Sequence, residues 1–214
     1  MDAGLKRELQ ERVRAGERLG REDGIALYGS DDLAWLGGLA HEVRRGKHGD
    51  AAYFGAGETG SAAGVEELRY GYGEEPGALV DGLLRLRELQ ERTGALQVVT
   101  PLCEAPGTPE RAVTGAEVLK TFALARLLLD NVSHLRVSWT AHGAQTAQLV
   151  LQHGADDIDG TAGADGEQLT REDLVELIRD AGLRPVERDA RYEVVREYEG
   201  PDPALRESPQ PMRL

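Results

Sequence analysis

The residues with the clearest capacity for chemistry lie in an acidic stretch of the sequence, ADDIDGTAGADGEQ. It holds the carboxylates Asp156, Asp157, Asp159 and Glu167. Carboxylates grouped in this way are typical ligands for Mg²⁺ or Ca²⁺. The spacing is not that of an EF-hand, because no glycine stands where the calcium loop needs its sharp turn. We therefore interpret the stretch as an acidic surface loop.

A glycine-rich segment suggests a second kind of chemistry. GAGETG at 55–60 matches the G-x-G-x-x-G pattern, in which backbone amides at a helix N-terminus hold a pyrophosphate. The preceding DAAYF is too short and too weak for a buried parallel strand. The next strand is expected to begin at about Glu67, which leaves too little chain for a crossover helix. We therefore interpret the segment as a flexible joint and not as a dinucleotide site.

Cys103 and His142 follow two neighbouring predicted strands, as a nucleophile and its base would. No basic residue flanks Cys103, and the neighbouring Glu104 favours a raised thiol pKa, so an inert side chain is the preferred interpretation. The sequence has no other cysteine. This excludes an internal disulfide, a cysteine-rich zinc site and an iron–sulfur cluster held by thiolates of this sequence alone.

Three further residues have the right chemistry for a site. Glu74 and Glu75 could form a general-base pair, but carboxylates at the start of a helix also stabilise its positive end, which is the interpretation we prefer. Trp139 closes a predicted strand and could stack on a purine ring. A tryptophan in the core or at its rim is equally plausible there.

The elements that must position these residues follow from periodicity and caps. In the first 48 residues, helices are predicted over 4–15 and 21–28, and a third begins after a cap at Ser30 or Asp31. After residue 66, predicted strands alternate with predicted helices: strands 67–73, 96–102 and 134–139, and helices 76–93, 115–131 and 144–152. A capping box at Thr170 and Asp173 opens a last helix, followed by a small β element in LRPVERD and RYEVVRE.

This alternation predicts an α/β fold with parallel strands. It amounts to about three units, whereas a closed (β/α) barrel needs eight, so we predict an incomplete (β/α) barrel. The predicted segments are an N-terminal helical arm (1–54), a flexible linker (55–66), the partial barrel with its C-terminal element (67–198) and a disordered tail (199–214). A partial parallel sheet has open edges, so the chain is expected to associate or to be marginally stable.

Several long segments resemble one family. They are GERLGREDGIAL (16–27), HGDAAYF (48–54), LLRLRELQERTGALQVVTPL (83–102), LARLLLDNVSHLRVSW (124–139), HGADDIDGT (153–161) and LTREDLVELIRDAGLRPVERDARYEVV (169–195). They are similar to the radical S-adenosylmethionine enzymes of the futalosine route to menaquinone, aminofutalosine synthase and dehypoxanthine futalosine cyclase. GADDIDGT favours the synthase side. The resemblance implies a (β/α) barrel that uses a [4Fe–4S] cluster and S-adenosylmethionine.

The sequence departs from the family where its chemistry is expected. The family's cysteine loop, C-x-x-x-C-x-x-C, is absent after Tyr53 and Phe54, so radical initiation by this chain alone is not expected, and we assign it no cofactor. The family's Gly-His-x-Glu-Thr turn reads GYGEE here, which keeps Glu74 and loses the histidine. A family His-Pro reads Ala105-Pro106, and the insertion after GADDIDGT is reduced to AGA (162–164).

Three hypotheses follow for function. The first is a truncated, non-catalytic paralogue of aminofutalosine synthase that acts, if at all, as a partner of a full-length homologue or of a second copy of itself. The second is a split-barrel subunit that completes the reaction with a cluster-bearing chain. The third is a binding module that keeps a substrate pocket. Its expected residues are Glu74, Trp139, Asp156, Asp157 and Asp159.

The overall charge disfavours two classes of binding partner. The sequence has 38 acidic and 25 basic residues, a net charge of −13, which repels the phosphates of nucleic acids and of anionic membranes. No apolar run reaches the length of a membrane span, and the charged N-terminal segment lacks the apolar region of a signal peptide. We expect a cytoplasmic protein without nucleic-acid or membrane partners.

Overall fold

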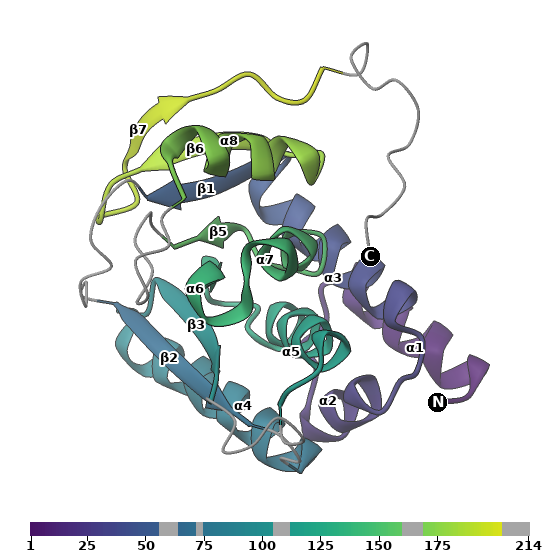
Figure 1. The fold of residues 1–214 in the computed structure, drawn as a ribbon. Coiled ribbons are helices and arrows are strands. Elements are labelled where there is room, and N and C mark those ends of the chain that lie inside the picture. Colours follow the sequence, from purple (N-terminus) through teal and green to yellow (C-terminus); the bar gives the residue numbers. More distant parts are fainter. Residues whose placement is uncertain (56–63, 72–74, 105–111, 160–168, 203–214) are drawn as a thin grey trace.

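The computed structural model describes residues 1–55, 64–71, 75–104, 112–159 and 169–202 (Figure 1). Its helices are α1 (Ala3–Arg14), α2 (Arg21–Tyr28), α3 (Leu33–His48), α4 (Pro76–Thr93), α5 (Gly115–Leu128), α6 (Trp139–His142), α7 (Ala144–Leu151) and α8 (Arg171–Asp180). Its strands are β1 (Ala51–Gly55), β2 (Val65–Tyr70), β3 (Val98–Cys103), β4 (His134–Val137), β5 (Asp157–Ile158), β6 (Arg184–Arg188) and β7 (Val194–Glu197). The predicted α/β class is confirmed.

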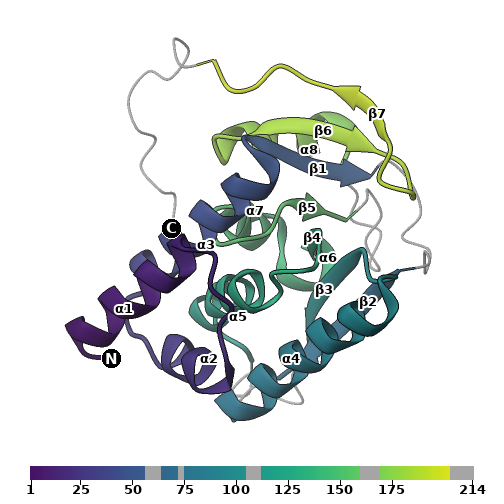
Figure 2. The same cartoon turned by 180° about the vertical axis from the view of Figure 1, so that it is seen from behind.

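The strands form one seven-stranded sheet in the order β2-β3-β4-β5-β1-β6-β7. All neighbours are parallel except β6 and β7, which form the predicted small antiparallel element at the C-terminal end. The sheet therefore has more parallel strands than the three predicted units supply. Figures 1 and 2 show β2 and β7 at its opposite edges, so the described strands form an open sheet and not a closed barrel.

The largest departure from the sequence prediction is β1. The interpretation of DAAYF as too weak for a buried parallel strand is wrong, because β1 pairs in parallel with both β5 and β6. The segment expected to be a helical arm thus ends in a central strand of the sheet. Its apolar content is low, but Ala52 and Phe54 are fully buried against the core. Tertiary packing has overridden the weak local propensity here.

Helix ends follow local signals closely. Pro76 opens α4 and Gly94 closes it with a φ of 62°, the left-handed conformation that glycine adopts without strain. Capping boxes open α5 at Thr114 and α8 at Thr170, the second as predicted. The cap of α3 was predicted at Ser30 or Asp31, but it is Asp32, whose side chain accepts a hydrogen bond from the Trp35 backbone N–H.

The two faces of the sheet differ in chemistry. Alternate residues such as Leu135, Val137 and Ile158 join the hydrophobic core with the helices, and α5 packs against both β3 and β4. The residues between them form what we call the polar face: Tyr53, Glu67, Thr100, His134, Arg136 and Asp157, which the strand register places on one side. Asp157, the one predicted site residue within β5, lies on the polar face. None of the described helices is long and apolar enough to cross a membrane.

Candidate functional site

Asp156 lies immediately before β5, and its side chain is fully buried. The interpretation of this stretch as an acidic surface loop is wrong for Asp156, Asp157 and Asp159, all of which are buried. Arg126 of α5 donates to Oδ1 of Asp156, which also accepts from the Leu135 backbone N–H at 2.9 Å. Burial is the largest single influence and raises the pKa of this carboxyl, but Arg126, His134 and His48 together outweigh it and hold the pKa well below its usual range.

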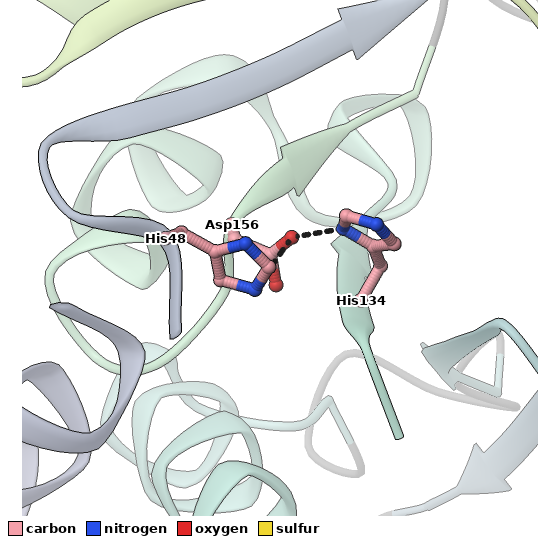
Figure 3. A group of neighbouring side chains, drawn as sticks. All are labelled: His48, His134 and Asp156. Carbon is pink, nitrogen blue, oxygen red and sulfur yellow. Dashed lines mark hydrogen bonds and ion pairs between the residues drawn. The ribbon is translucent and has the colours of Figure 1, made fainter. Parts of the chain in front are cut away.

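Two imidazoles flank the same carboxylate (Figure 3). His134 Nδ1 lies 2.6 Å from Oδ2 of Asp156, and His48 Nε2 lies 3.5 Å from it. The rings stack with their centroids 5.1 Å apart. His48 Nε2 also donates to the Ser133 carbonyl at 3.0 Å, and burial lowers the pKa of His48. The cluster thus joins the end of α3 to the amino ends of β4 and β5.

The most specific functional interpretation of this cluster is a metal-binding site. His48, His134 and Asp156 bring three potential ligand atoms within 4.8 Å of one another. The surrounding positive charge opposes the binding of a cation. Arg126 forms an ion pair with Asp156, and the fully buried Arg44 is close enough to interact with the charges of both residues. His48 Nε2 uses its proton on a carbonyl and is not available as a ligand. We assign the cluster a structural role.

Asp157 lies on the polar face and is surrounded by donors. Arg136 Nε donates to Oδ2 at 2.6 Å, Arg188 donates to both oxygens at 2.7–3.0 Å, and the Tyr192 hydroxyl donates to Oδ2 at 2.5 Å. Tyr192 has a φ of 63°, unusual for a tyrosine, and stacks on His134 with centroids 4.1 Å apart. This carboxylate is fully engaged by the protein itself.

Asp159 and Trp139 lie at the carboxyl ends of β5 and β4, the edge at which barrel enzymes place their sites. Asp159 Oδ1 accepts from the Trp139 backbone N–H at 2.9 Å and so caps the start of α6. Burial raises the pKa of Asp159, although the hydrogen bonds from Ser138 and Trp139 oppose the shift. Trp139 is 4% exposed and belongs to the core. Whether these two residues contact a ligand stays a prediction.

His142 is paired with Tyr70 and not with Cys103. Its Nδ1 donates to the Ser138 carbonyl at 2.9 Å, so its Nε2 accepts from the Tyr70 hydroxyl at 3.0 Å. Cys103 Sγ instead lies 3.6 Å from the Ala141 carbonyl, and burial raises the pKa of the thiol. The arrangement supports the inert interpretation of Cys103.

Two other predicted features fall largely outside the described residues. Glu74 lies outside them, as do residues 56–60 of GAGETG, whose first glycine is the last residue of β1. The partners Arg126, Arg136, Arg188 and Tyr192 were missed by the sequence reasoning, as was the role of His48 and His134. Each is remote in sequence from the carboxylate that it contacts. The one local signal was the clustering of the acidic residues themselves in the sequence ADDID.

The buried imidazoles predict an acid-sensitive fold. Burial lowers the folded-state pKa of His48 and His142, so below about pH 6.5 the unfolded chain binds more protons than the folded chain. The free energy of unfolding is therefore expected to hold its full contribution from these two histidines above this pH. It should fall as the pH drops toward 5. Thermal unfolding followed by circular dichroism between pH 5 and 8 measures the effect. His142→Gln should flatten the slope, and an unchanged slope in this variant would contradict the assignment.

Comparison with known proteins gives a consistent picture. Residues 103–200 match the family model described as the CofH/MqnC C-terminal region. The chain is 37% identical to aminodeoxyfutalosine synthase of Streptomyces coelicolor, with all of both chains covered. That alignment runs over 387 positions against the 214 residues present here, so a large part of the relative has no counterpart in this chain. Aminodeoxyfutalosine synthase of Thermus thermophilus is 36% identical over 62% of this chain and 40% of its own length.

Solved structures support the fold alone. The FeFe-hydrogenase maturase HydG from Carboxydothermus hydrogenoformans superposes with a TM-score of 0.62 at 10% identity. The match covers 85% of this chain and 79% of the maturase. The likeness therefore extends over most of the described sheet and helices.

Proposed function

Because this chain belongs to the radical S-adenosylmethionine family of the futalosine route to menaquinone, we propose that it is a shortened member that has lost radical initiation and acts by binding. One observation carries the proposal: the sequence contains a single cysteine, Cys103. The [4Fe–4S] cluster of this family is held by three thiolates, and without it no electron reaches the sulfonium of S-adenosylmethionine. The residues present do not fit that cluster.

The strand order supports an internal loss. β1 and β2 follow one another in the sequence, yet β3, β4 and β5 lie between them in the sheet. Residues 56–64 are all that connects them, fewer than the dozen or so residues that a parallel crossover with its helix needs. The long unmatched part of the Streptomyces coelicolor relative is consistent with central β/α units lost at this point.

The state of the predicted pocket also favours a role without catalysis. Asp156 and Asp157 are both engaged by arginines of the same chain, and Trp139 lies in the core. These side chains stabilise the shortened sheet. What remains for function is binding, either of a nucleoside of the pathway or of another protein chain.

Anaerobic reconstitution with ferrous iron and sulfide tests the proposal. We expect no stoichiometric iron, no charge-transfer absorbance of a cluster and no cleavage of S-adenosylmethionine. Cys103→Ser should give the same background as the unmodified chain. The Streptomyces coelicolor relative, treated in parallel, is the positive control.

One cluster per chain, with cleavage of S-adenosylmethionine, would overturn the proposal. Cleavage that appears only after this chain is mixed with a cluster-bearing chain that is inactive on its own would replace it with the split-barrel alternative. Titration calorimetry with aminofutalosine distinguishes the two forms of binding, since a pathway nucleoside releases or absorbs heat only if a pocket is retained.

A further inference from the structure

The outer edge of β2 carries an interaction surface that the function proposed above does not require. On its inner side β2 pairs with β3, and there Gly64 O accepts from Gln97 N and Tyr70 O accepts from Glu104 N, both at 2.8 Å. Backbone groups alternate in direction along a strand, so Glu67 and Arg69 direct their N–H and C=O groups away from β3. In the described part of the chain, no strand pairs with that side of β2 (Figures 1 and 2).

The side chains along this edge have a simple charge pattern. Glu67 and Arg69 lie on the polar face, form an ion pair at 2.7 Å and have side chains 50% and 64% exposed. Leu68 lies between them and faces the opposite side, against Gly82 of α4. The sequence Glu-Leu-Arg therefore places an acid and a base symmetrically about one residue, both of them accessible.

We propose that the edge of β2 binds β2 of a second copy of this chain, antiparallel, with a twofold axis at Leu68. In that register Glu67 of one copy lies opposite Arg69 of the other, twice. Both residues present outward backbone groups, so they form hydrogen-bonded pairs across the axis. The sheets of the two copies then join into one.

The charges select this register over its neighbours. A twofold axis at Glu67 would place two glutamates opposite each other, and an axis at Arg69 would place two arginines there. Like charges directly opposite are unfavourable in an antiparallel pair. A slip to an axis between two residues would turn the backbone groups of one copy away from the other. Among these registers, the pairing at Leu68 is the one that satisfies the backbone and also sets opposite charges against each other.

Charge reversal tests the pairing. The mass of the whole chain, measured by sedimentation equilibrium over a range of concentrations, is expected to show a dimer. Glu67→Arg and Arg69→Glu each place like charges across the axis and should raise the dimer dissociation constant about tenfold or more. The double variant with both reversals restores opposite charges and should return the dissociation constant to within about threefold of the original.

A proline variant provides a second test with its own control. The N–H of residue 67 faces outward, so Glu67→Pro removes two hydrogen bonds of the dimer, one from each copy, and none with β3. It should abolish the dimer while circular dichroism stays unchanged. Glu172→Arg, a charge reversal on α8, which packs on β6 toward the other end of the sheet, should leave the dimer intact. A chain that is monomeric throughout would overturn the proposal. So would a dimer that resists both reversals and the proline, because its interface then lies elsewhere.

Discussion

Replacing Asp156 by alanine is expected to destabilise the fold by about 3–5 kcal/mol. Asp156 is fully buried, and it is the carboxylate that neutralises the fully buried Arg126. Alanine would leave the guanidinium charged in a site from which water is excluded, and it would also remove the acceptor for the Leu135 backbone N–H. Urea unfolding monitored by circular dichroism measures the free energy of unfolding.

Glu176→Ala is the matched control for that experiment. Glu176 also pairs with an arginine, Arg179, but it lies on the exposed side of α8, so its loss should cost less than about 0.5 kcal/mol. A cost below about 1 kcal/mol for Asp156→Ala would contradict the structural role. A variant that kept its stability but lost a ligand would instead favour the predicted substrate-binding role of Asp156.

The elements that could be predicted from the sequence are those fixed by local chemistry. The bounds of α4 follow from Pro76 and Gly94, and α8 begins at the capping box of Thr170 because both partners lie within one turn of helix. Helix α2 was predicted with both of its bounds, Arg21 and Tyr28. Such signals act over a few residues, so each one is contained within a short segment of the sequence.

The elements that could not be predicted depend on distant partners. β1 is a strand because β5 and β6, which follow it by more than a hundred residues, pair with both of its edges. The acidic stretch looked like a surface loop because nothing near it in sequence neutralises it. Its cations come from α5, β4 and β6. The residue type alone does not show whether a carboxylate is buried. That depends on whether an arginine distant in the sequence forms an ion pair with it.

The candidate site shows the same division. Sequence reasoning selected Asp156, Asp157 and Asp159 by their type and Trp139 by its place at the end of a strand. It could not foresee that their hydrogen-bonding capacity is used within the chain. The resemblance to the futalosine enzymes was sufficient to identify the family, because it extends over long segments that occur in the same order. The same resemblance does not show whether a site residue shared with the family still binds a ligand in this chain.

The second large effect is expected for Asp157→Asn, at about 3 kcal/mol or more. The substitution keeps the shape of the side chain but removes the charge that balances Arg136 and Arg188, both less than a tenth exposed. The new amide nitrogen is itself a donor and would face the donors of Arg136, Arg188 and Tyr192. Chemical denaturation gives the loss in free energy of unfolding.

Tyr192→Phe separates the charge from the hydrogen bonds in this cluster. It removes one donor to Asp157 and one acceptor for Arg136, and it leaves both ion pairs, so it should cost about 1–2 kcal/mol. Arg188→Met combined with Asp157→Asn should cost less than the two single losses added together, because one unbalanced cation has gone with its partner. Additive losses would mean that Asp157 and Arg188 act independently. The strong coupling expected instead would identify this cluster as the link that holds β4, β5 and β6 together on the polar face of the sheet.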